Sequence, residues 1–118
     1  YSLGLADIAR GMAVIAEAIK EFPWPSSASC PQILLVSPPP LTHAATQGLL
    51  AEFDARSIAL SEQLADAYRQ VAELESCDFL DAGKVAQVGS FDGVHLDADG
   101  HHALGLAIAA KLREMAGR

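Results

Sequence analysis

The 118-residue sequence predicts an α/β chain that forms part of a three-layer α/β/α structure built on a parallel β-sheet. Two short apolar runs, at residues 32–37 and 77–83, are separated by a long amphipathic stretch. This is the order of a βαβ unit, whose two strands are parallel neighbours. Further amphipathic stretches lie toward both ends, and 51% of the residues are hydrophobic, which is ample for a core.

The first helix is expected over residues 5–22. Its apolar side chains recur every three or four residues, at Leu5, Ile8, Met12, Ile15, Ile19 and Phe22. The stretch PWPSSASCP then leaves the helix and crosses a loop. In that loop we expect Phe22 and Trp24 to pack back on the helix, with contacts to another copy of the chain as the alternative. Cys30 and Cys77 lie in no metal-binding spacing and are interpreted as buried small apolar residues.

The first strand is expected in QILLVS, residues 32–37, which is apolar enough to be buried on both faces. A second helix follows, with a stripe of Phe53, Ser57, Leu60, Leu64, Ala67, Val71 and Leu74. CDFLDAG, residues 77–83, is the second strand. The last helix should begin near Ala98 after an Asp97 N-cap, with Leu104, Ile108, Leu112 and Met115 on one face.

Two strands and three helices cannot cover one another's apolar faces as an independent parallel sheet, because buried parallel strands need neighbours on both sides. The chain also begins at Tyr1, whereas an initiator Met is normally removed only before small residues. We therefore expect residues 1–118 to be the C-terminal part of a single larger domain.

The composition excludes two classes of partner. The net charge is −7, with only eight Lys and Arg residues, so the chain lacks the positive charge that nucleic-acid binding requires. No apolar stretch approaches the roughly 20 residues needed to cross a bilayer. A cytoplasmic protein is expected, with export left open because the natural N-terminus is not seen.

The connections at residues 38–52 and 83–97 are longer than an α/β unit requires, and both leave the carboxyl ends of parallel strands. In open α/β sheets that edge is where ligands bind. Asp92 and His95 lie in the second connection, three residues apart. The carboxylate can therefore hold one imidazole nitrogen while the other faces a cleft, which is how a general base is oriented in nucleophilic catalysis. The same spacing also arises in turns that merely close a loop.

No metal or cofactor is expected. His101 and His102 are adjacent, so on a helix they point about 100° apart and cannot share an ion. We expect His101 to pack on the apolar stripe of the last helix and His102 to be solvated.

FDGVHLDADGHHALGLAIAAKL, residues 91–112, resembles the terminal block of SGNH hydrolases, the GDSL-type esterases and lipases. ILLVSPPPL, LADIARGM and FLDAG resemble segments of their arylesterase and acyltransferase branch, in the same order. The resemblance implies a flavodoxin-like fold and a Ser-His-Asp triad in which Asp92 and His95 are two members. The family's G-D-S block and its Asn block are absent, because the chain has no G-D-S and no Asn.

The function that the resemblance implies is ester hydrolysis, possible acyl transfer included, by an enzyme whose serine and oxyanion donors lie in an N-terminal segment outside this chain. Its partners are then a small-molecule ester, that N-terminal segment and, as in this branch, further copies of itself. Pro39, Pro40, Leu41 and Val94 are expected to line an apolar substrate pocket. The alternative is a non-catalytic α/β module or degenerate relative that acts in assembly.

Overall fold

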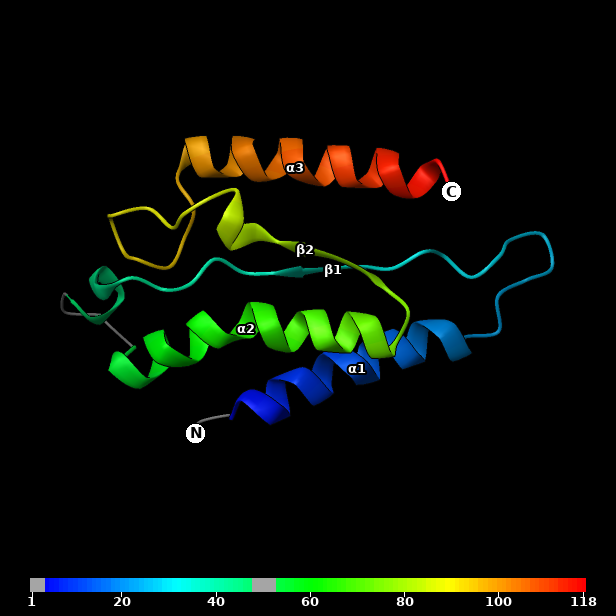
Figure 1. The fold of residues 1–118 in the computed structure, drawn as a ribbon, viewed down its shortest axis with the longest axis horizontal. Helices are drawn as coiled ribbons and strands as arrows, with labels where there is room; N and C mark the ends of the chain where they lie inside the picture. The colour runs from blue at the N-terminus through cyan, green and yellow to red at the C-terminus, as the bar shows by residue number, and fades with distance from the viewer. Residues whose placement is uncertain (1–3, 48–52) are drawn as a thin grey trace.

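The computed structural model describes residues 4–47 and 53–118 (Figure 1). Tyr1 and the end of the expected connection at residues 38–52 lie outside the described residues. The helices and strands follow the expected order: α1 (Leu5–Glu21), β1 (Leu34–Ser37), α2 (Ala55–Leu74), β2 (Asp78–Asp81) and α3 (Ala98–Ala116). Two short 3₁₀ helices, η1 (His43–Thr46) and η2 (Ala82–Lys84), follow the two strands.

The sheet separates two helical layers. β1 and β2 pair in parallel, with Leu34 opposite Asp78 and Ser37 opposite Asp81. Figure 1 shows α1 and α2 on one side of the two strands and α3 on the other. The predicted α/β class, the βαβ order and the parallel pairing are therefore confirmed.

The core lies between the sheet and α2. Leu35 of β1 packs with Val71 and Ala72 of α2, and partly buried residues close the cluster: Ala9, Met12, Ala13, Ile33, Cys77 and Phe79. Along β1, Leu35 and Ser37 are buried while Leu34 and Val36 are only half-buried. The prediction of a strand buried on both faces was therefore wrong for the described chain, because α2 covers one face of β1 more completely than anything covers the other.

The buried faces of α1 and α2 differ from the predicted stripes. Small residues bring α1 onto α2, and Ala16 is fully buried while Ile15 remains 55% exposed. Phe22 lies just beyond α1 and Phe53 just before α2, and both are exposed. Leu74 is exposed at the end of α2. Spacing located these helices, but the neighbouring element decided which side of each is covered.

The loop after α1 folds back on the helix as expected. The indole Nε1 of Trp24 donates to the carbonyl oxygen of Ile19 at 2.8 Å, and the Trp24 and Phe22 rings meet edge to face. Cys30, further along this loop, is exposed, and Cys77 is only partly buried. Burial of both cysteines was wrong. The stretch around Cys30 crosses to β1 with every side chain from Glu21 to Gln32 exposed, so nothing packs over the thiol.

The start of α3 is capped as predicted. The carboxylate of Asp97 accepts a hydrogen bond from the backbone N–H of Gly100 at 2.8 Å, which satisfies one of the N–H groups that a helix start leaves unpaired. Leu104 and Ile108 are half-buried and Met115 is buried, but Leu112 is 50% exposed. α3 therefore presents a narrower apolar face to the sheet than its sequence predicts.

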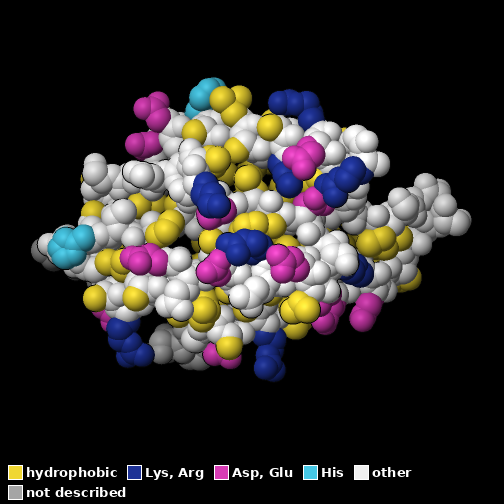
Figure 2. Space-filling model, viewed as in Figure 1, with side chains coloured by type: hydrophobic (Ala, Val, Ile, Leu, Met, Phe, Trp, Pro, Cys, Tyr) yellow, Lys and Arg dark blue, Asp and Glu magenta, His cyan; other side chains and the backbone are white. Residues whose placement is uncertain are grey.

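Much apolar surface remains open. The accessible surface is 7995 Å², whereas a folded monomer of 12.4 kDa exposes roughly 6100 Å². Figure 2 shows hydrophobic side chains at the surface between the α3 layer and the α1–α2 layer. Among the helices described, none combines the length and apolar character of a membrane span.

We expect Asp97→Ala to lower the free energy of unfolding by about 1 kcal/mol, because the N-cap hydrogen bond to Gly100 is lost. Asp99→Ala is the matched control, since Asp99 lies in the first turn of α3 without being its cap. Urea denaturation measures both variants. Equal losses would contradict the assigned role of Asp97.

Candidate active site

The two strands end at the same edge of the sheet, and a loop leaves each end (Figure 1). A proline-rich segment and η1 follow β1, while η2 and a long loop that reaches Asp97 follow β2. The expected meeting of both connections at the carboxyl edge is thus confirmed for the residues that the structure describes.

Hydrogen bonds join the two strand ends. The hydroxyl of Ser37, which is fully buried, donates to Oδ1 of Asp81 at 3.4 Å, and the same oxygen accepts from the backbone N–H of Gly83 at 2.9 Å. At Gly83 an added Cβ would lie 3.0 Å from Cδ of Pro40. The two connections therefore start in close contact.

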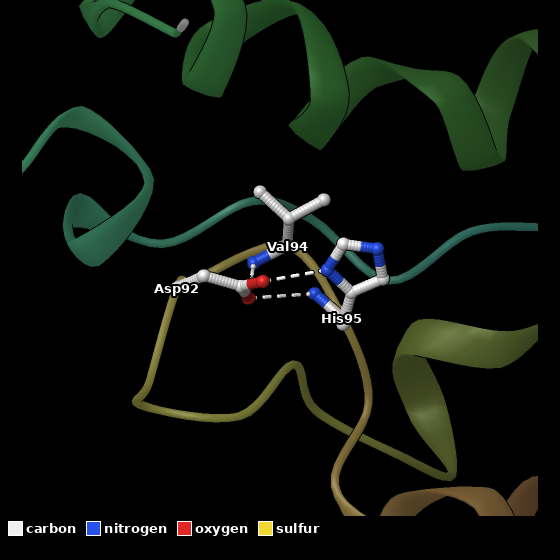
Figure 3. Close-up of polar contacts among 3 residues, drawn as sticks. All are labelled: Asp92, Val94 and His95. Atoms are coloured by element: carbon white, nitrogen blue, oxygen red, sulfur yellow. Dashed lines mark hydrogen bonds and ion pairs between the residues drawn. The ribbon is translucent and has the colours of Figure 1, made fainter. Parts of the chain in front are cut away.

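Asp92 organises the turn that carries His95 (Figure 3). Its Oδ1 accepts the backbone N–H groups of Val94 and His95, each at 2.9 Å. Its Oδ2 lies 2.5 Å from Nδ1 of His95. The short side chain of Asp92 thus closes the turn and holds the imidazole at the same time. Asp suits this position because its carboxylate reaches backbone N–H groups two or three residues further along the chain.

These hydrogen bonds keep the carboxylate of Asp92 ionised. The backbone N–H of His95, then its imidazole, then the backbone N–H of Val94 lower the pKa of Asp92 from 3.8 to about 2. Each of them stabilises the charged form more than the neutral form. A carboxylate that stays negative beside Nδ1 fixes the imidazole tautomer and stabilises an imidazolium.

The remaining ring nitrogen of His95 is available for chemistry. The His95 side chain is 81% exposed, and Figure 3 shows Nε2 on the side of the ring away from Asp92. Within residues 4–47 and 53–118, no hydroxyl group hydrogen-bonds to this imidazole. The imidazole is therefore oriented through Nδ1 and open at Nε2.

The structure places the expected pocket residues on both loops. Pro39 and Leu41 are half-buried, as is Val94 beside the turn. Pro40 lines a cavity of about 140 Å³ together with Ser61 and Asp81. A larger and shallower cavity of about 590 Å³ is lined by residues 83–90 and the first turns of α3, and neither Asp92 nor His95 is among its lining residues.

His101 does not pack into the apolar face of α3. Gly100 is buried and, with Ala103, faces the loop at residues 83–90. His101 and His102 consequently lie on the open side of the helix, and both are exposed. The prediction was wrong for His101, because the first turn of α3 packs through its smallest residues.

Ser61 is a functional candidate that the sequence reasoning missed. Its hydroxyl is buried within α2 and accepts the backbone N–H of Leu41 at 2.9 Å, while donating to the carbonyl of Ile58 at 2.7 Å. In the sequence Ser61 is one more small polar residue beside the predicted stripe, which itself contains Ser57. Spacing could not reveal that it faces the loop after β1.

We expect the carboxyl of Asp92 to titrate with a midpoint near 2 instead of 3.8. Because the folded-state pKa is lowered, the stabilisation that this group contributes is complete above the unfolded value of 3.8 and is lost as the pH falls toward 2. Carbon-13 NMR of the carboxyl measures the midpoint. A value at or above 3.8 would show that the turn is not held by these hydrogen bonds.

Comparison with solved structures identifies the architecture. One solved chain is 38% identical with a TM-score of 0.93, and the match covers 99% of this chain and 53% of that one. A carbohydrate acetylesterase family member from Sinorhizobium meliloti is 33% identical with a TM-score of 0.83, covering 98% of this chain and 54% of that one. The aryl esterase of M. smegmatis is 26% identical with a TM-score of 0.80, and the match covers 95% of this chain and 53% of that one.

No protein-family model matches the sequence, and neither does any curated protein. The chain spans about half the length of the solved structures that it matches, which fits the C-terminal half of such a protein. Together, the α/β/α layers and the likeness to acetylesterase and aryl esterase structures show that the chain has the SGNH hydrolase fold and is similar to the C-terminal half of such a protein.

Proposed function

We propose that the protein is an ester hydrolase in which His95 is the general base and Asp92 its orienting acid. The observation that carries this proposal is the contact of 2.5 Å between Oδ2 of Asp92 and Nδ1 of His95, which leaves Nε2 exposed. Support also comes from the names of the similar structures, a carbohydrate acetylesterase and an aryl esterase.

The proposed reaction is acyl transfer through a serine supplied by an N-terminal segment of the same protein. Nε2 of His95 takes the proton of the serine hydroxyl while the serine oxygen attacks the ester carbonyl carbon. The imidazolium then returns this proton to the leaving alcohol, and an acyl-enzyme remains. Water, activated by the same nitrogen, releases the acid and regenerates the serine. An alcohol in place of water would give acyl transfer.

The chain's own residues contribute orientation, charge and an apolar wall. The negative Asp92 stabilises the imidazolium that forms in both halves of the reaction. Pro39, Pro40, Leu41 and Val94 would contact the apolar part of the ester. The upstream segment would add the serine and the oxyanion donors.

Three observations support such a segment as the partner of this chain. The sheet has only two strands among the residues described, and the total accessible surface is larger than that of a typical folded monomer of this size. The similar solved chains are about twice as long. Additional strands beside β1 or β2 would cover this surface and complete the cleft in front of His95.

We expect His95→Ala to lower kcat/KM for a small aryl ester by about 10⁶-fold in the full-length protein, because the proton acceptor is lost. Asp92→Asn should cost less, about 10⁴-fold, since the turn can survive while imidazolium stabilisation is lost. His101→Ala and His102→Ala are the matched controls and should retain most activity, because both side chains are exposed on α3. Comparable losses in all four variants would contradict the assignment of His95.

Residues 1–118 expressed alone should be inactive toward small esters and poorly folded. No serine is positioned at His95 in the described chain, and open strand edges with apolar surroundings favour aggregation. Adding the upstream segment, covalently or as a separate chain, should restore solubility and activity. A soluble, cooperatively melting monomer of the 118 residues would instead support a self-sufficient, non-catalytic module.

A further inference from the structure

The turn that holds His95 has no regular secondary structure of its own, so its position must be set by what it contacts. Its middle residue, Gly93, is buried and has φ of +69°, a conformation that favours glycine. The carbonyl oxygen of Gly93 accepts the backbone N–H of Thr42 at 3.1 Å. Thr42 belongs to the other connection, which follows β1.

The contact between these two loops is closely packed. A Cβ added at Gly93 would lie 2.4 Å from the backbone nitrogen of Ala45 and 2.7 Å from Oγ1 of Thr42. Ala45 is itself buried, at 3% exposure, inside η1. The turn around Gly93 therefore rests directly on the backbone of η1, with no space for a side chain.

The loop that receives Gly93 is in turn attached to α2. The buried hydroxyl of Ser61 accepts the backbone N–H of Leu41, the residue before Thr42. A continuous path thus runs from the Ser61 hydroxyl on α2 to the backbone of Leu41 and Thr42, and from Thr42 to the carbonyl of Gly93. From Gly93 the path continues into the hydrogen-bonded turn of Asp92 and His95 (Figure 3).

We propose that Gly93 and Ser61 are positioning residues for the imidazole of His95. Gly93 lets the turn of His95 pack directly against η1, and Ser61 fixes the loop that carries η1 to α2. Neither residue contacts the imidazole of His95 through a hydrogen bond, so each acts on it indirectly: Gly93 through its backbone and Ser61 through its hydroxyl. The catalytic consequence rests on the proposed ester hydrolysis, whereas the packing of the two loops does not.

The test is Gly93→Ala in the full-length protein, with Gly105→Ala on α3 as the matched control. At Gly105 an added Cβ meets nothing within 4 Å, so this control should behave as the wild type. At Gly93 the turn must move by roughly 1 Å to bring the contact of 2.4 Å up to an ordinary 3.4 Å. A displacement of that size corresponds to a fall in kcat of about 100-fold, with KM nearly unchanged.

Ser61 offers a milder second test that does not strain the turn. Ser61→Ala leaves the N–H of Leu41 without its acceptor and should lower kcat about tenfold. Ser61→Thr keeps the hydroxyl and should restore most of this loss. This pair decides the proposal if Gly93→Ala does not fold.

Two measurements test the positioning role without relying on ester hydrolysis. Hydrogen exchange should show the Thr42 N–H protected in the wild type and Gly105→Ala, and unprotected in Gly93→Ala. The carboxyl of Asp92 should titrate above its value of about 2 in Gly93→Ala, because the strained backbone displaces the N–H groups of the turn. If the wild-type protein hydrolyses no ester, the proposed function fails and these two measurements still decide the positioning role.

The proposal is overturned if folded Gly93→Ala retains Thr42 protection and the wild-type titration of Asp92. It is also overturned if kcat stays within twofold of the wild type in a hydrolytically active protein, or if Ser61→Thr is as impaired as Ser61→Ala.

Discussion

The parallel pairing of β1 with β2 puts Ser37 opposite Asp81, and the candidate site depends on this register. The pairing makes both strands end at one edge of the sheet, so the proline-rich loop and the loop of His95 start side by side. The Ser37–Asp81 hydrogen bond and the contact between Gly83 and Pro40 then hold the two loop bases together. A shift by one residue would turn these side chains to the other face.

Beyond that edge, hydrogen bonds to backbone groups hold the turn of His95 in place. The carbonyl of Gly93 and the N–H of Thr42 join the loops a second time, farther from the sheet. Asp92 then uses one oxygen for two backbone N–H groups and the other for the imidazole of His95. The same hydrogen bonds that close the turn keep the carboxylate of Asp92 ionised, so the local structure of the turn and the charge beside His95 have one cause.

Part of the exposed apolar surface results from the incomplete cover of the same sheet. α2 covers one face of β1 closely, whereas α3 lies over the other side with only a narrow buried face. The match to similar solved structures covers nearly all of this chain but only about half of each of those chains. Both facts favour a sheet continued by other strands.

The sequence by itself determined the α/β class, the order of the elements, the N-cap at Asp97 and the pairing of Asp92 with His95. These follow from local physics, since helical spacing, capping and a turn of three residues involve neighbours along the chain. The tertiary structure alone decided which face of each helix is buried, the exposure of Cys30 and His101, and the contacts of Gly93 and Ser61. Those features depend on contacts between segments far apart in sequence. The path of each loop decides which residues a small side chain packs against and which backbone groups it can hydrogen-bond.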